Sequence, residues 1–108
     1  MNPWLALAVA IVLEVSGTVS MKLSDGFTRL VPSILIFIFY ASSFAVLTLA
    51  LKKIDLGVAY AVWAGAGTAL IAVVGVLYFK EPLSALKVLS IFLIIAGVIG
   101  LNLSGAKH

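Results

Sequence analysis

The sequence has no cysteine, a single histidine and few charged residues. Without cysteine the chain cannot form disulfides, a thiolate nucleophile or a cysteine-based metal site. The one histidine, His108, leaves neither a catalytic triad nor a histidine cluster for a metal. Only 10% of the 108 residues are charged and 64% are hydrophobic, whereas soluble domains are about 25% charged and about 45–50% apolar. These absences argue against an enzyme, a metal protein and an ordinary soluble domain.

What the sequence does contain is four long apolar segments. A helix needs about 20 apolar residues to cross the roughly 30 Å hydrocarbon core of a bilayer. The segments cover residues 4–21, 31–51, 57–79 and 84–103, and short polar turns between them make neighbouring helices antiparallel. We therefore expect an all-α integral membrane protein, with residues 1–108 as a single four-helix transmembrane domain. It should be a multi-pass protein of the inner (plasma) membrane, without a cleaved signal peptide, because the first segment lacks a basic leader.

The basic residues are divided almost evenly between the two sides of the expected membrane spans. They are Lys52, Lys53 and Lys107 on the side of the amino terminus, and Lys22, Arg29, Lys80 and Lys87 on the other. The positive-inside rule therefore gives almost no preferred orientation. Either another determinant fixes one topology, or the chain inserts both ways and forms an antiparallel, dual-topology dimer with an inverted copy of itself. Basic residues scattered in this way do not indicate nucleic-acid binding.

Glu14 is the only acidic residue within the four segments. At 1.5 Å per residue it lies about 15 Å and about 10 Å from the ends of the first segment. An ionised carboxylate at this depth costs at least about 2.5–3.5 kcal/mol. Glu14 must therefore be protonated, reach water or hold an imported cation, and competition between protons and cations for one carboxylate is the physical basis of an exchanger. The alternative is a structural glutamate that is hydrogen-bonded to a neighbouring helix.

Small and aromatic residues recur at helical spacing in the first three segments. Around Glu14 the small residues leave room for a ligand or for another helix. Aromatic rings attract lipophilic and quaternary cations. The candidate substrate-binding residues are Trp4, Gly17, Thr18, Tyr40, Ser43, Phe44, Tyr60 and Trp63. For Trp63 and the two tyrosines, packing or an interfacial aromatic belt is the alternative.

Glycines and other small residues mark the third and fourth segments. Glycine inside a helix accompanies either a bend or close packing, so Gly65 and Gly67 are candidate hinge residues between two access states. In the fourth segment Leu86, Ser90, Leu93, Gly97 and Gly100 recur at alternating spacings of four and three. Such a seam permits close contact between helices. It predicts a dimer contact at Ser90, Leu93, Gly97 and Gly100, and packing within one subunit is the alternative.

Three features together resemble the small multidrug resistance family of exporters. They are the lone glutamate in the first of four short spans, residues 26–30 (GFTRL) and residues 59–63 (AYAVW), and the similarity covers essentially the whole chain. The resemblance implies an antiparallel dimer that exchanges protons for cationic substrates, with protons as the coupling ion and no other cofactor. It implies that Glu14 is the shared proton and substrate site, that Trp63, Tyr60 and Tyr40 line it with Ser43 as a hydrogen-bonding neighbour, and that Gly97 is a dimer contact.

The branch of the family is indicated by residues 14–18 (EVSGT), which resemble members that export quaternary ammonium and aromatic cations. Residues 79–83 (FKEPL) are more similar to the guanidinium exporters, and residues 25–27 with the Asp55 loop resemble polyamine exporters and two-component members. Ala64 and Ser90 depart from a serine and a glycine that are common in the family. The leading hypothesis is a proton-coupled antiporter of lipophilic cations that works by alternating access. Guanidinium or polyamine export, a passive channel, and a non-transporting subunit of a heterodimer are the alternatives.

Overall fold

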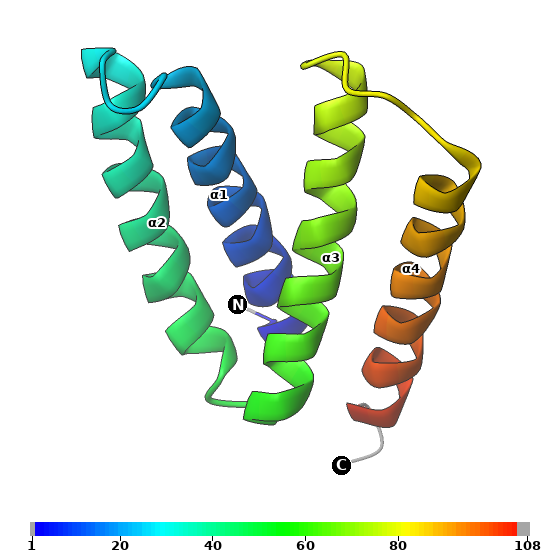
Figure 1. The fold of residues 1–108 in the computed structure, drawn as a ribbon. Coiled ribbons are helices and arrows are strands. Elements are labelled where there is room, and N and C mark those ends of the chain that lie inside the picture. Colours follow the sequence, from blue (N-terminus) through cyan, green and yellow to red (C-terminus); the bar gives the residue numbers. More distant parts are fainter. Residues whose placement is uncertain (1, 106–108) are drawn as a thin grey trace. The chain divides into compact units, whose positions relative to one another are not determined.

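The computed structural model describes residues 2–105, which form four helices. They are α1 (Pro3–Leu23), α2 (Leu30–Ala50), α3 (Leu56–Leu77) and α4 (Ala85–Gly105) (Figure 1). Each is long and apolar enough to cross a membrane, which confirms the expected all-α architecture with four transmembrane helices. The bounds differ by at most two residues from those expected. Lys107, which entered the charge count, and His108 lie outside the described residues.

Local sequence signals set the two ends of α1. The Asn2 side chain accepts hydrogen bonds from the backbone N–H groups of Trp4 and Leu5, at 2.8 and 3.4 Å, and so caps the helix. Pro3 occupies the first helical position, where its missing N–H group costs nothing. After α1 the chain reverses through Asp25, Gly26 and Phe27, whose φ angles are 49°, 70° and 68°. A short turn of this kind makes α1 and α2 antiparallel neighbours.

The chain divides into two compact units, residues 1–54 with α1 and α2, and residues 55–108 with α3 and α4. In the first hairpin α1 packs along α2. Small residues bring the two backbones together, since Ala10 and Ala50 are fully buried and Gly17 is also buried. A side chain at Gly17 would place its Cβ 2.7 Å from two ring carbons of Tyr40. Close approach through small residues is the usual way in which membrane helices associate.

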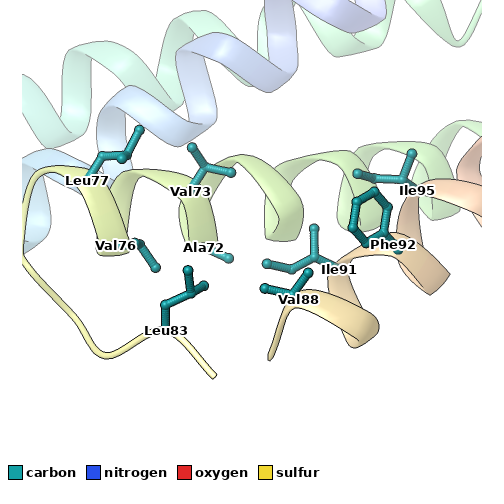
Figure 2. Close-up of a pocket in the computed structure, with 9 residues that line it drawn as sticks. All are labelled: Ala72, Val73, Val76, Leu77, Leu83, Val88, Ile91, Phe92 and Ile95. Carbon is teal, nitrogen blue, oxygen red and sulfur yellow. The ribbon is translucent and has the colours of Figure 1, made fainter. Parts of the chain in front are cut away.

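In the second hairpin α3 packs against α4. Gly65 of α3 lies so close to α4 that a Cβ there would sit 2.6 Å from a methyl carbon of Val98. At the other end of the hairpin an open cavity of about 300 Å³ separates the helices (Figure 2). Its lining is apolar throughout: Ala72, Val73, Val76, Leu77, Leu83, Val88, Ile91, Phe92 and Ile95. These side chains offer no polar atom to a cation, so this cavity contains no ionisable group.

Candidate functional site

Glu14 lies near the middle of α1 and is partly buried. Its side-chain partner is Thr18, one helical turn further along, where residues i and i+4 share a face. The Thr18 hydroxyl oxygen lies 3.0 Å from Oε1 of Glu14 and 3.1 Å from the backbone carbonyl oxygen of the same residue. The carboxylate therefore has a hydroxyl donor on its own helix.

Tyr40 brings the second helix to this site. Its phenol oxygen lies 2.7 Å from Oγ1 of Thr18, and its ring covers the backbone of Gly17. Of the two occupants expected beside Gly17, a ligand or another helix, the structure shows an aromatic ring of α2. The phenol oxygen also lies 3.5 Å from Sδ of Met21. Glu14, Thr18 and Met21 together present a continuous face of α1 to Tyr40.

Ser43 and Phe44 lie one turn further along α2. Ser43 is completely buried, and its hydroxyl donates a 2.6 Å hydrogen bond to the backbone carbonyl of Ala10 on α1. This bond joins the two helices, and it occupies the one proton that the Ser43 hydroxyl can donate. Phe44 is 52% exposed and stacks on Tyr40, with ring centroids 6.1 Å apart. Tyr40 and Phe44 therefore form an aromatic pair at the open edge of the hairpin.

Of the remaining candidate binding residues, Trp4 is on α1 and Tyr60 and Trp63 are on α3 in the second hairpin. Trp4 is in the first turn of α1, about 15 Å from Glu14 along the helix axis. Tyr60 is 64% exposed, and its ring meets Trp63 edge to face with centroids 6.2 Å apart on α3. Gly67 is buried in α3, and Gly65 makes the close contact with α4 described above. Close packing therefore accounts for Gly65, while its role as a hinge stays a prediction.

Most of α4 is exposed, and the residues of the candidate dimer seam are among its exposed residues. Leu86 and Leu93 are 72% and 65% exposed, and Ser90 is exposed between them. A Cβ built on Gly97 or Gly100 meets no atom within 4 Å. Ile94 and Val98, which lie about a quarter turn away from this face on α4, are next to Gly65 of α3. The residues of the candidate dimer seam thus form an exposed, largely apolar stripe that contains small residues.

Charged side chains other than Glu14 lie near the helix ends or in the connections of the first hairpin. Lys22 is in the last turn of α1, and Asp25 and Arg29 follow in the turn before α2. Lys52 and Lys53 come after α2. The described part of the first hairpin therefore carries the Glu14 carboxylate near its centre, with the hydroxyl groups of Thr18 and Tyr40 in line with it.

Sequence reasoning missed Met21 as a neighbour of Tyr40 and missed the bond between Ser43 and Ala10. Met21 follows Glu14 by seven residues, which is two helical turns, so the helical period could have placed it on the same face. The Ser43 bond depends on the rotation of α2 against α1, for which the sequence carries no local signal.

Comparison with known proteins places the chain among membrane exporters. Residues 2–94 match the family model described as Small Multidrug Resistance protein. The multidrug resistance protein EbrB of Bacillus subtilis (strain 168) is 48% identical over 106 residues, which are 98% of this chain and 91% of that protein. The quaternary ammonium compound-resistance protein QacH of Staphylococcus saprophyticus is 42% identical over 106 residues, 98% of this chain and 99% of that protein.

A further relative has no assigned activity in its description. The uncharacterized membrane protein YvaE of Bacillus subtilis (strain 168) is 61% identical over 100 residues, which are 93% of this chain and 84% of that protein. All three relatives therefore match nearly the full length of the chain.

Proposed function

Because the chain belongs to the small multidrug resistance family, and is therefore a multi-pass multidrug exporter of the plasma membrane, we propose that it exchanges protons for lipophilic and quaternary ammonium cations at Glu14. The observation that carries this proposal is a carboxylate near the middle of α1 whose side-chain partner is a neutral hydroxyl. An ionised carboxylate at mid-membrane is costly unless a positive partner is present. A proton and an organic cation are alternative partners, so release of one favours uptake of the other.

The preference for aromatic and quaternary cations is supported by the aromatic pairs on both hairpins. Tyr40 stacks with Phe44 on α2, and Tyr60 meets Trp63 on α3. A quaternary ammonium group has no N–H donor, so it is bound by charge and by ring faces, and each favourable ring contact is worth about 0.5–2 kcal/mol. The relative named for quaternary ammonium resistance supports the same class. Protons are the coupling ion, and the proposal requires no other cofactor.

The working unit in this proposal is an antiparallel homodimer. The nearly even division of basic residues between the two sides of the membrane supports insertion in both orientations. The uncovered stripe of α4 supplies a contact surface with small residues at Ser90, Gly97 and Gly100. Two Glu14 carboxylates, one from each subunit, would then share one cavity. Alternating access follows when the two subunits exchange conformations.

The test is transport in vesicles that contain the purified protein alone. We expect an imposed pH gradient, acidic on the side to which tetraphenylphosphonium moves, to drive accumulation of this lipophilic cation against its own gradient. Collapse of the pH gradient should stop accumulation. Flux that runs only downhill and ignores pH would indicate a passive channel and contradict the proposal. Absence of transport until a related chain is added would contradict the homodimer, and stronger competition by guanidinium or a polyamine than by quaternary ammonium would contradict the substrate class.

The proposed dimer contact leads to a separate prediction for Gly97. A Cβ at this position meets no atom within 4 Å apart from its chain neighbours and the nearby backbone of its own helix, so the subunit should fold normally with leucine there. In the dimer the larger side chain should hold the two α4 helices apart. We expect Gly97→Leu to weaken dimer formation in detergent or lipid at least tenfold, as measured by energy transfer between labelled chains. Gly57→Leu is the matched control, since its Cβ is also unobstructed but lies outside α4. Unchanged dimer affinity in Gly97→Leu would contradict this contact.

A further inference from the structure

A continuous chain of polar groups joins Glu14 on α1 to Tyr40 on α2. Oγ1 of Thr18 stands between them, 3.0 Å from Oε1 of Glu14 and 2.7 Å from the phenol oxygen of Tyr40. Each hydroxyl group has a single proton to donate. The direction in which this chain donates is therefore fixed by the group at its end.

An ionised Glu14 sets that direction. A carboxylate only accepts hydrogen bonds, so Thr18 must be the donor to it. The backbone carbonyl of Glu14 at 3.1 Å competes for the same proton, but charged acceptors form hydrogen bonds roughly twice as strong as neutral ones. Thr18 then has only lone pairs left for Tyr40, so the phenol must be the donor in the 2.7 Å contact. The chain runs from Tyr40 through Thr18 to the carboxylate, and each bond polarises the next.

When Glu14 is protonated, Thr18 and Tyr40 no longer have to donate in this direction. The acid group is itself a donor, and its remaining oxygen is a weaker acceptor than a carboxylate. The Thr18 proton can then go to the backbone carbonyl, and the phenol proton can go to Sδ of Met21, which lies 3.5 Å away. Every hydroxyl keeps its own proton in both states, and only the orientations of the O–H bonds change. The chain therefore stabilises the ionised form of Glu14 and gives little to the neutral form.

We infer that Thr18 and Tyr40 are positioning residues for the exchange, which lower the cost of an ionised Glu14 between proton release and cation binding. This inference rests on the proposed function and extends it, because it assigns the proton–cation balance to neutral residues on two helices. It also links the charge of Glu14 to the contact between α1 and α2, since Tyr40 touches Glu14 only through Thr18. Gly17 permits this link, because any Cβ there would displace the Tyr40 ring.

Other titratable groups of the first hairpin do not offer the same stabilisation. From α2, the helix packed against α1, the titratable group that faces Glu14 through Thr18 is the Tyr40 phenol. On α1 itself Lys22 is two turns beyond Glu14, about 12 Å along the axis. Asp25, Arg29, Lys52 and Lys53 lie in the connections. Effects on the pH profile in Thr18 and Tyr40 variants therefore report on the hydroxyl chain.

The experiment measures binding of tetraphenylphosphonium to the purified full-length protein as a function of pH. Thr18→Val replaces the hydroxyl by a methyl group of similar size, and Tyr40→Phe removes the phenol oxygen but keeps the ring. We expect each variant to move the pH of half-maximal binding upward by about one unit, a tenfold change in the proton–cation balance. The affinity that each variant reaches at high pH, where protons compete least, is measured separately and serves as the reference for that variant's own pH profile. Thr18→Ser should restore the original profile.

Two comparisons make the result specific. The Thr68 hydroxyl on α3 donates a 2.6 Å hydrogen bond to the backbone carbonyl of Ala64, four residues earlier. Thr68→Val is therefore the matched control, and it should leave the pH profile of cation binding unchanged. The double variant Thr18→Val/Tyr40→Phe should shift the profile no further than Thr18→Val alone, because Tyr40 acts through Thr18. Additive shifts would overturn the inference, since Tyr40 would then act independently.

The remaining outcomes separate this inference from the proposed function. If Glu14→Gln loses pH-dependent binding but Thr18→Val and Tyr40→Phe keep the wild-type profile, the hydroxyl chain is overturned and the exchange at Glu14 stands. If Glu14→Gln keeps a pH-dependent, saturable site, the proposed function itself fails. Should Thr18→Val not fold, as judged by its helical circular dichroism, Tyr40→Phe decides the question by the same titration.

Discussion

Glu14→Gln is expected to weaken tetraphenylphosphonium binding at high pH by at least about 100-fold and to abolish its accumulation in vesicles. Glutamine keeps the size of the side chain and an oxygen that can accept from Thr18, so the contact between the helices is retained. What it removes is the negative charge. At about 4 Å and an effective dielectric constant of about 20, a unit pair attracts by about 4 kcal/mol, and each 1.4 kcal/mol is tenfold in affinity.

The pH dependence of the same variant is part of the prediction. In the wild type we expect protons and the cation to compete for the carboxylate, so that cation binding weakens as the pH falls. The residual binding of Glu14→Gln should be independent of pH, because the amide does not titrate. Isothermal calorimetry over a series of pH values measures both effects. Glu81→Gln makes the same chemical change at an exposed acid between α3 and α4, and it should bind and transport as the wild type does. Full affinity in Glu14→Gln would remove the basis of the proposed exchange.

Gly17→Val is expected to have the second-largest effect, on both folding and binding. A Cβ at this position would lie 2.7 Å from two Tyr40 ring carbons and 3.3 Å from the Phe39 Cβ, so the ring must move. Its displacement breaks the 2.7 Å contact between Tyr40 and Thr18. Overpacking of this kind costs about 1–3 kcal/mol of stability. We expect a lower unfolding midpoint in detergent and at least tenfold weaker cation binding near neutral pH.

A second substitution separates the two consequences of Gly17→Val. Tyr40→Ala in the same chain removes the ring that collides with valine, so the unfolding midpoint should recover in the double variant. Cation binding should not recover, because the phenol and its aromatic face are both gone. Gly57→Val is the control, since its Cβ meets no atom within 4 Å. Wild-type stability and binding in Gly17→Val would contradict the described packing of Tyr40 on α1.

Relations within a single helix were predictable from the sequence. Glu14 and Thr18 are four residues apart, and Tyr40 and Phe44 are four residues apart, so the helical period alone brings each pair onto one face. The structure places both pairs in contact. The four spans were predictable for a similar reason, because an uncharged run of about 20 residues has few alternatives to a membrane helix.

Relations between helices were not predictable in the same way. Nothing in the sequence indicated that the Ser43 hydroxyl donates to the carbonyl of Ala10. The sequence predicted room for a ligand or for another helix around Glu14, and the structure places the Tyr40 ring of α2 against Gly17. Both outcomes depend on how far α2 is rotated and shifted along α1. That register is set by the sum of many small packing contacts, and no short motif encodes it.

Composition and the 3.6-residue period were enough to predict that this protein lies in a membrane, that it crosses it in four helices, and that one acid is carried into the apolar interior. These properties are local and additive. The contact of Tyr40 with Thr18 and the bond from Ser43 to the Ala10 carbonyl became visible only when the helices were packed together. A hydrogen bond between helices requires two atoms to meet within about 3 Å, and that distance is fixed by packing.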